Sequence, residues 1–307
     1  MTDIALPREP RARSALSSEP ISRVPGSAVR AHHLPVPDSL RPIVSALVGV
    51  EMDVSGPTPL AIAPHESLVL SLQFARGRCD PIGPKADLGL GTSLTGIRQW
   101  TGSFVGAGDC VTLFALLTPV GAVQLLDSRR LDQSPRIRAP LAHLLDEGVT
   151  RPLESRIALV HGLPDKLRAF GHWLESRAAA WRQQDRTAMR AARAAMRVLM
   201  HPLEPVDRLA DEQHVSRRQL ERDLERWVGV SPHHLAQVAR VQGVARDVYA
   251  GASLADAAAG QGFTDQPHMN RVVRKLTGLT PRQFVRSRMS PFGEAFRAAT
   301  GGATVYL

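Results

Sequence analysis

The chain has 307 residues, enough for about two domains and at least one sizeable core. Hydrophobic residues make up 43% of it and charged residues 22%, which excludes a collagen-like repeat or a chain that is disordered throughout. Its net charge of +9 comes almost entirely from arginine and favours a polyanionic partner, because each neutralised phosphate releases counterions.

The first thirty residues are rich in proline, serine and arginine and poor in large apolar side chains. Such a segment buries too little surface to offset the entropy of ordering, so residues 1–30 are expected to form a mobile arm. They contain no apolar stretch of the kind found in secretory signals. The longest uncharged stretch, 110–126, is interrupted by Pro119 and Gly121, so we expect a cytoplasmic protein without a membrane segment.

Residues 60–120 have the period of β-strands. Large apolar side chains alternate with smaller or polar ones in 67–75, and the alternation recurs in 110–117. The turn-forming residues 106–109 separate the latter run from 97–105, which predicts a β-hairpin. Several short strands joined by turns are typical of an antiparallel sandwich or barrel.

From Val120 onward the apolar period becomes helical. Helices are expected in four segments, which are 121–126, 140–147, 151–160 and 165–184. A further segment, 187–200, is rich in alanine, methionine and arginine and has high helix propensity. We place the junction between the two domains near residues 184–190.

A helix-turn-helix is predicted in residues 206–229. Leu209 lies on the apolar face of a short first helix, and Ser216 is a suitable N-cap for a second helix with Leu220 and Leu224 on its core face. The N-terminal end of a recognition helix meets the edges of the bases. Three arginines lie at that end here: Arg217, Arg218 and Arg222.

The same arrangement recurs in residues 253–278. Gly262 can take the positive φ that ends a helix, Phe263 fills the core, and Thr264 or Asp265 caps the next helix. The inward face of that helix is apolar, at Met269, Val272, Val273 and Leu276. Its remaining side chains are polar and mostly face outward: Gln266, His268, Asn270, Arg271, Arg274 and Lys275.

One long helix is expected over 232–249, between the two units, and no segment of 188–290 has the period of a strand. After the second unit, Thr280 and Pro281 begin another short helix. The part of the chain from 188 to 290 holds sixteen basic and ten acidic residues, so most of the net charge lies there.

Residues 190–288 resemble the DNA-binding domain of the AraC/XylS family of bacterial transcription regulators. The string LADAAAGQGFTDQPHMNRVVRKLTGLTPRQF is similar to the family signature at Leu254, Ala255, Gly262, Phe263, Asp265, Arg271, Lys275, Gly278, Thr280, Pro281 and Phe284. Met269 and Val273 stand where the family has phenylalanine, which are hydrophobic changes of modest cost. Pro267 falls in the first turn of the second recognition helix, where the missing N–H would be unsatisfied anyway.

The resemblance implies two helix-turn-helix units joined by a rigid helix, each entering one of two successive major-groove segments about one helical turn apart. It transfers base reading to Arg218, Arg222 and the adjacent Arg217 in the first unit, and to Gln266, Asn270 and Arg271 in the second. Arginine suits guanine, and asparagine or glutamine suits adenine. His268 belongs to the same polar face, and Arg274, Lys275 and Arg282 are expected to contact phosphates.

These residues also have a purely structural interpretation. Arg218 and Arg222 could belong to a solvated helix face, flanked by Glu221 and Glu225 at spacings that allow ion pairs. Arg271 could be the partner of a structural ion pair. Trp227 is expected in the core.

The N-terminal half carries no set of residues that predicts a metal site, a bound cofactor or catalysis. Its histidines and Glu66 are isolated, whereas a metal-binding cupin needs ligands converging from adjacent strands. The two cysteines, Cys79 and Cys110, are expected to be structural thiols in a reduced compartment. The isolated residues are His32, His33, His65 and Glu66.

The resemblance therefore implies an α+β protein, with a cupin-like, β-rich N-terminal domain followed by helices and an all-α C-terminal domain with two helix-turn-helix units. The expected parts are an arm (1–30), a sensor or dimerisation domain (31–186), a DNA-binding domain (187–290) and a tail (291–307).

We expect a sequence-specific regulator of transcription, with activation favoured, that is not an enzyme and needs no cofactor. Double-stranded DNA of a promoter operator is the expected partner. A small-molecule effector, RNA polymerase and a second copy of the chain are further candidates. Two alternatives stay open: an architectural nucleic-acid binder without sequence preference, and a DNA-modifying enzyme, which would need a reactive cysteine near a base.

Overall fold

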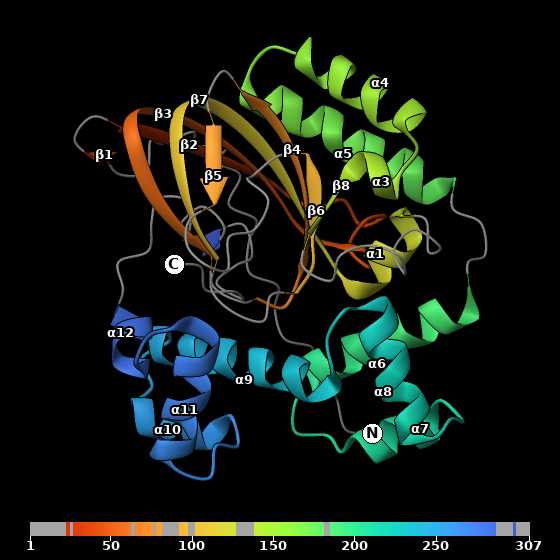
Figure 1. Ribbon diagram of the computed structural model, residues 1–307, viewed down its shortest axis with the longest axis vertical. Helices are drawn as coiled ribbons and strands as arrows, with labels where there is room; N and C mark the ends of the chain where they lie inside the picture. The colour runs from red at the N-terminus through yellow and green to blue at the C-terminus, as the bar shows by residue number, and fades with distance from the viewer. Residues whose placement is uncertain are drawn as a thin grey trace, which may run out of the picture.

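The structure, a computed structural model, contains a β-rich N-terminal domain and an all-helical C-terminal domain (Figure 1). It describes residues 23–24, 27–62, 65–75, 78–81, 92–97, 102–126, 138–180, 185–286 and 297–298. The expected arm lies outside the described residues up to residue 22, and its end carries β1 (Arg23–Val24) and the start of β2 (Ser27–Leu34). All but two residues of the expected tail also lie outside them.

The N-terminal domain is built on one eight-stranded antiparallel sheet. Its order is β1-β2-β3-β7-β4-β6-β8, and β5 also pairs with β7. The two longest strands, β3 and β7, pair with each other at the centre. Beyond β1 and β2, the strands are β3 (Val44–Ile62), β4 (Leu68–Ala75), β5 (Arg78–Pro81), β6 (Ser93–Thr95), β7 (Gly102–Leu117) and β8 (Arg138–Pro140).

The prediction of β structure in residues 60–120 missed β2 and most of β3, which lie before residue 60. The first half of β3 is buried on both faces: Leu47 packs in the main core, whereas Val48 and Val50 belong to an apolar cluster on the opposite face. A strand buried on both faces lacks the alternation of apolar and polar residues by which strands are recognised.

The predicted β-hairpin with a turn at 106–109 is also wrong. These residues lie inside β7, which runs without a break from Gly102 to Leu117. The irregularity lies in the partner strand, where the pairing with β3 shifts register between Val54 and Thr58, opposite Gly106–Gly108. Glycine within a strand often marks such a bulge rather than a turn.

Helix α5 packs on one face of the sheet, against β2, β3 and β7 (Figure 1). The absence of a side chain at Gly49 leaves room for Leu163 of α5, and Gly171 of the same helix lies against Leu47. The opposite face carries the second apolar cluster, which includes Cys110. The helices of this domain are α1 (Pro119–Leu125), α3 (Leu141–Leu144), α4 (Glu147–Ala158) and α5 (Leu163–Ala179).

The described part of the C-terminal domain, 185–286, is all helical, as the sequence predicts. Its first helix packs against α1 of the sheet domain and against α8 and α9 of its own domain, so one core runs through both. Five alanines on its buried face let three helices approach closely. The helices are α6 (Arg186–Met200), α7 (Val206–Glu212), α8 (Arg217–Trp227), α9 (Pro232–Tyr249), α10 (Leu254–Gly260), α11 (Gln266–Thr277) and α12 (Pro281–Arg286).

The predicted fold class is confirmed as α+β, with a β-rich domain and following helices, and an all-α domain with two helix-turn-helix units. Within the described residues, no helix is both long and apolar enough to cross a membrane.

Candidate nucleic-acid interface

The first helix-turn-helix unit consists of α7 and α8 and forms as the sequence predicts. The Ser216 hydroxyl accepts a hydrogen bond from the backbone N–H of Gln219 at 3.2 Å, so it caps α8. Leu220, Leu224 and Trp227 are buried on the inner face. The opposite face and the N-terminal end of α8 are therefore left for solvent or a partner.

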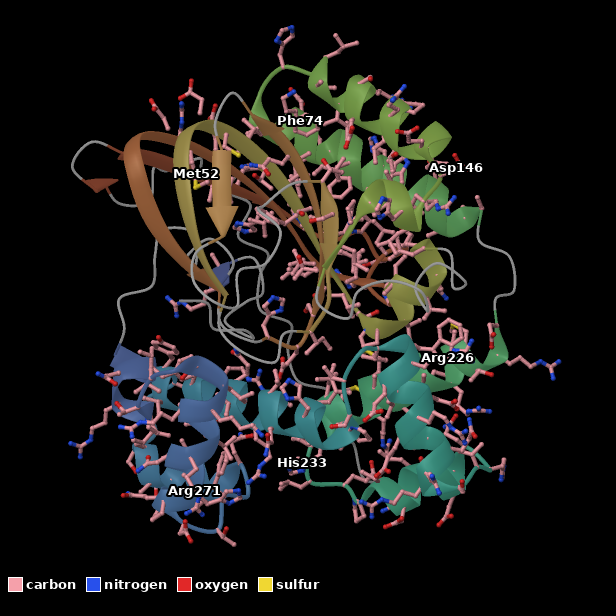
Figure 2. All side chains as sticks on the ribbon, viewed as in Figure 1. Met52, Phe74, Asp146, Arg226, His233 and Arg271 are labelled. Carbon is pink, nitrogen blue, oxygen red and sulfur yellow. The ribbon has the colours of Figure 1, made fainter. Side chains whose placement is uncertain are left out.

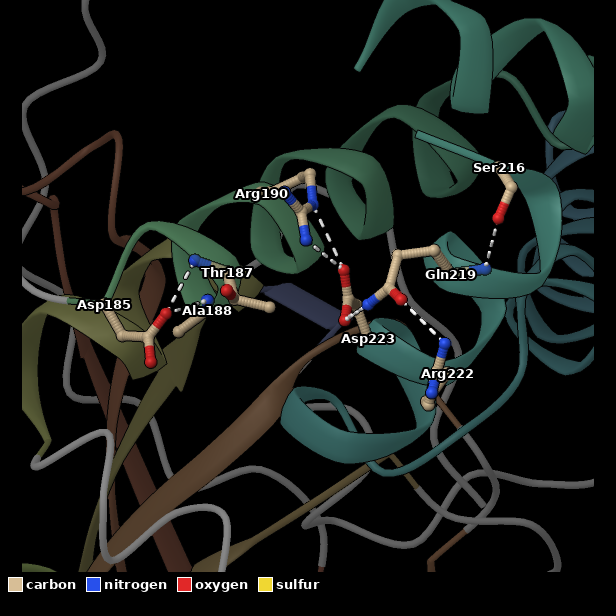
Figure 3. A network of polar contacts seen from close by, with 8 residues as sticks. All are labelled: Asp185, Thr187, Ala188, Arg190, Ser216, Gln219, Arg222 and Asp223. Carbon is tan, nitrogen blue, oxygen red and sulfur yellow. Dashed lines mark hydrogen bonds and ion pairs between the residues drawn. The ribbon is translucent and has the colours of Figure 1, made fainter. Parts of the chain in front are cut away.

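A buried carboxylate ties α8 to α6 (Figure 3). Asp223 is 2% exposed, and its side chain accepts hydrogen bonds from Nε of Arg190 at 3.1 Å and Nη2 at 2.5 Å. Its other oxygen accepts from the side-chain amide of Gln219 at 2.7 Å. Because both oxygens are satisfied, this network fixes the rotation of α8 relative to α6.

The three arginines predicted for the first unit are exposed, but their surroundings differ. Arg217 forms ion pairs with Glu221 at 2.9 Å and Asp207 at 3.3 Å, and the hydrogen bond with Glu221 is the main cause of its raised pKa. Arg222 donates to Oε1 of Gln219 at 2.7 Å. Arg218 has no such partner within the described part of the chain.

The second unit, α10 and α11, also forms as predicted. Gly262 has a φ of 70°, Phe263 is buried, and Asp265 is the cap of α11, with Oδ1 accepting from the backbone N–H of His268 at 2.6 Å. Pro267 lies in the first turn without disturbing α11, whose four predicted core residues are all buried. The helix ends at Gly278, in the left-handed conformation.

The outward face of α11 is polar and exposed, and it lies far from the sheet domain (Figure 2). No side chain of this set hydrogen-bonds or forms an ion pair with another described residue: Gln266, Asn270, Arg271, Arg274 and Lys275. His268 differs from them, because its ring contacts the Thr264 hydroxyl at 3.0 Å and lies edge-on to Phe263. The structure therefore brings five of the six predicted side chains of α11 to the surface and turns the sixth onto the core.

A groove of about 500 Å³ opens beside α11. The first turns of α10, α11 and α12 border it, and both apolar and polar side chains line it. The exposed Arg282, at the start of α12, adds a positive charge at its rim. The lining residues are Ser253, Leu254, Ala255, Gln266, Met269, Asn270, Thr280, Pro281 and Arg282. Such a groove can receive the backbone of a nucleic acid.

Both units lie on the side of the molecule that faces away from the sheet, at the two ends of α9 (Figures 1 and 2). Helix α9 has 18 residues, which corresponds to a length of about 27 Å. That length is close to the pitch of B-form DNA, about 34 Å, over which a major groove returns to the same face. Helix α9 thus separates the two units along its length.

Reasoning from the sequence missed Asp223, and it missed the contacts of Arg240 in α9. Nε of Arg240 donates to the carbonyl of Gln261 at 2.7 Å, and its guanidinium stacks on Phe263 at 4.0 Å. In both cases the position of the residue in the helical period could have revealed it. Asp223 stands on the core face defined by Leu220 and Leu224, and Arg240 interrupts the apolar stripe of α9, so each position calls for a buried polar partner.

The N-terminal domain carries no comparable site within the described residues, where no three metal-ligating side chains come together. His65 is buried, and Glu66 forms an ion pair with Arg246 of α9 at 3.2 Å. Burial raises the pKa of Glu66, and Arg246 opposes that shift. Cys110 is a buried free thiol, and the side chain of Cys79 lies outside the described residues.

Comparison with known proteins assigns the C-terminal part. Residues 209–287 match the family model described as a helix-turn-helix domain. No curated protein matches the chain.

Three solved structures are similar at low identity. ToxT from Vibrio cholerae O395 is 10% identical, with a TM-score of 0.40, over 85% of this chain and 97% of that one. Wild-type ToxT from V. cholerae strain SCE256 with a bound unsaturated fatty acid is 9% identical, with a TM-score of 0.42, over 86% and 96%. The AraC-like transcriptional activator CuxR is 12% identical, with a TM-score of 0.29, over 77% and 86%.

Proposed function

We propose that the chain is a DNA-binding transcription regulator of the AraC type, in which α8 and α11 read two neighbouring segments of one DNA site. The match of residues 209–287 to a helix-turn-helix domain supports this proposal. The observation that carries this proposal is that both units lie on the side of α9 away from the sheet (Figure 1) and that both recognition helices carry exposed polar side chains. We assign DNA binding to residues 187–290 and sensing or dimerisation to 31–186.

In this proposal Arg218 and Arg222 read bases in the first segment, with Arg217 beside them. Gln266, Asn270 and Arg271 read the second segment. Arginine pairs with guanine, and amide side chains pair with adenine. Arg274, Lys275 and Arg282 contact phosphates, which position the protein without specifying sequence. We keep His268 in the interface as the residue that holds the first turn of α11 in place.

The sheet domain then acts as the controlling part. Its contact with the DNA-binding domain runs through α1 and α6 and through the ion pair of Glu66 with Arg246. A small molecule or a second copy of the chain that binds the sheet domain more tightly in one domain arrangement than in another would shift the DNA-binding population. We place the protein in the cytoplasm, without catalytic activity, and with RNA polymerase as its further partner at a promoter.

Selection of duplexes from a random pool by the full-length protein tests the central claim. We expect one site with two submotifs about ten base pairs apart. Arg218→Ala and Arg271→Ala should each weaken binding by about 1–3 kcal/mol, and each should relax the preference at one submotif only. Arg156→Ala removes an exposed arginine from α4 in the sheet domain and is the matched control.

Two results would contradict this assignment. If no site is enriched and both variants weaken all DNA equally, the protein is a non-specific binder. Its affinity would then depend steeply on salt, with little difference between specific and non-specific DNA. If Arg156→Ala weakens binding as much as Arg218→Ala, net charge rather than α8 carries the affinity.

A further inference from the structure

The turn between α10 and α11 is held from two sides. On one side lies α9, and on the other lies the loop that leads from α6 into the first helix-turn-helix unit. This turn, residues 261–263, is the first part of the connection 261–265 between α10 and the recognition helix α11. Whatever fixes the turn therefore fixes the direction in which α11 points.

Arg240 of α9 binds the turn through three contacts. Nε donates to the carbonyl of Gln261 at 2.7 Å and Nη2 donates to the carbonyl of Gly262 at 2.6 Å. The guanidinium also lies over the ring of Phe263, 4.0 Å from its centroid. These carbonyls belong to the C-terminal end of α10, where acceptors lack helical partners and carry partial negative charge. A planar guanidinium can donate to both carbonyls and stack on the ring of Phe263 at the same time, which an ammonium group cannot do.

A second residue of the turn binds back to the same face of α9. The side-chain amide of Gln261 donates to Oδ2 of Asp247 at 2.8 Å. Gly243 lies directly beneath this amide, where any side chain would overlap it. Arg240, Gly243 and Asp247 follow one another at helical spacing, so one face of α9 over two turns is shaped to hold the turn.

The first unit contributes the other side of the junction. The side chain of Leu203 lies against Gly262, where an added Cβ would come within 2.5 Å of it. Leu203 is 59% exposed, so the contact does not arise from burial in a core. Its neighbour Glu204 is held by a two-point ion pair with Arg197, at 2.7 and 3.2 Å, which anchors the loop to α6. The loop between α6 and α7, which leads into the first unit, thus meets the turn of the second.

We propose that this junction, made by Arg240, Gln261 and Leu203, sets the spacing between the two DNA segments that the protein accepts. Arg240 is a positioning residue in this proposal, because it acts on the direction of α11 and contacts no base. The proposal rests on the function proposed above. One added base pair moves a submotif by about 3.4 Å and rotates it by about 35°, so a rigid pair of helices rejects the changed spacing. A pair of recognition helices with a loosened junction tolerates the changed spacing.

The test measures binding of the full-length protein to duplexes in which the gap between the selected submotifs is shortened by one base pair, unchanged or lengthened by one. Arg240→Lys keeps the charge and removes the two-point fork. Leu203→Ala loosens the junction from the other side without changing any charge. Arg193→Lys makes the same chemical change at an exposed position of α6 and is the matched control. Thermal unfolding of each variant shows that it is folded.

We expect wild type and Arg193→Lys to prefer the unchanged gap strongly. In Arg240→Lys and Leu203→Ala the ratio of affinities for unchanged and altered gaps should fall by about fivefold, the scale of mutational effects on coupling between two sites. Their affinity for a duplex with the second submotif alone should stay at the wild-type value. A purely structural role of Arg240 would lower that affinity too.

Three outcomes would overturn the proposal. If both junction variants discriminate between gaps as wild type does, the junction does not set the spacing, and two-segment reading still stands. If Arg240→Lys weakens binding to every duplex equally, including the single submotif, Arg240 serves the fold alone. If wild type selects no two-part site, the proposed function fails together with this inference.

Discussion

The two helix-turn-helix units have the same local architecture but are held in different ways. In the first unit, the buried Asp223 ties α8 to α6, which in turn packs on α1 of the sheet domain. The second unit is attached to α9, with Arg240 holding its turn. The comparison teaches that the sheet domain reaches α8 through α1 and α6, whereas it reaches the second unit through the last turn of α9, where Arg246 pairs with Glu66.

The reading faces differ as well. Arg217 and Arg222 in the first unit are already engaged with neighbouring side chains, whereas Asn270 and Arg271 in the second have no such contacts with described residues. Engaged arginines are preorganised, but to bind DNA Arg217 must release its carboxylates and Arg222 must release the amide oxygen of Gln219. Free side chains lose more rotational freedom on binding but no existing contact.

The largest effect is expected from Asp223→Ala, which breaks the attachment of the first unit. It leaves the guanidinium of Arg190, 25% exposed, without its carboxylate, and should lower the free energy of unfolding by about 3 kcal/mol. Chemical denaturation measures this. Asp207→Ala removes an exposed carboxylate of the same unit and should change stability little. Equal losses in the two variants would mean that burial of Asp223 does not matter.

The second prediction compares two adjacent arginines of α8 in DNA binding. Arg218→Ala should weaken binding to the selected site by about 2 kcal/mol, because Arg218 gives up no interaction within the protein when it contacts DNA. Arg217→Ala should weaken it less, since Arg217 must first leave Glu221 and Asp207. Dissociation constants at one fixed salt concentration provide the measurement. The reverse order would show that preorganisation by Glu221 outweighs the loss of the ion pair.

The third prediction uses three glycines of the second unit. Gly262→Ala forces a side chain into the left-handed region and against Leu203, and should destabilise by about 1.5 kcal/mol. Gly278→Ala meets the same backbone restriction in open space and should cost about 1 kcal/mol. Gly260→Ala, helical and in open space, should stabilise by about 0.5 kcal/mol.

Thermal unfolding of the three glycine variants separates backbone strain from contact. If Gly262→Ala is no worse than Gly278→Ala, Leu203 gives way freely, and the contact between the two units is weaker than the structure indicates.

The smallest effect concerns the link between α9 and the sheet domain. Because burial raises the pKa of Glu66, the folded protein binds more protons than the unfolded chain just above the ordinary range of glutamate. Stability from this group is therefore present at low pH and is lost as the pH rises through the raised pKa. Glu66→Gln should remove that loss. The free energy of unfolding of the variant should therefore increase relative to wild type as the pH rises from the ordinary range of glutamate through the raised pKa.

Unfolding curves at a series of pH values measure the difference between Glu66→Gln and wild type, with Glu225→Gln, exposed on α8, as the control. If Glu66→Gln is less stable than wild type throughout, the ion pair with Arg246 outweighs the cost of burial.

Much of the C-terminal domain follows from signals that act over a few residues. The cap at Ser216, the positive φ of Gly262 and the apolar period of 232–249 each predict the observed element. In these helices a cap or a glycine acts within its own turn, so the predictions depended little on the rest of the chain. The arginines of α8 and the polar residues of α11 could be named from the sequence for the same reason.

Only the tertiary structure decided which distant residues meet. The length of β3, the unbroken course of β7 through Gly106 and the burial of Asp223 against Arg190 depend on partners far along the chain. Glu66 and Arg246 meet across 180 positions, which no local period encodes. The sequence by itself thus determined the helices and their reading faces, because capping and periodicity are local. The folded chain decided how the two units are joined and aimed, because packing and buried ion pairs form only between surfaces that folding brings together.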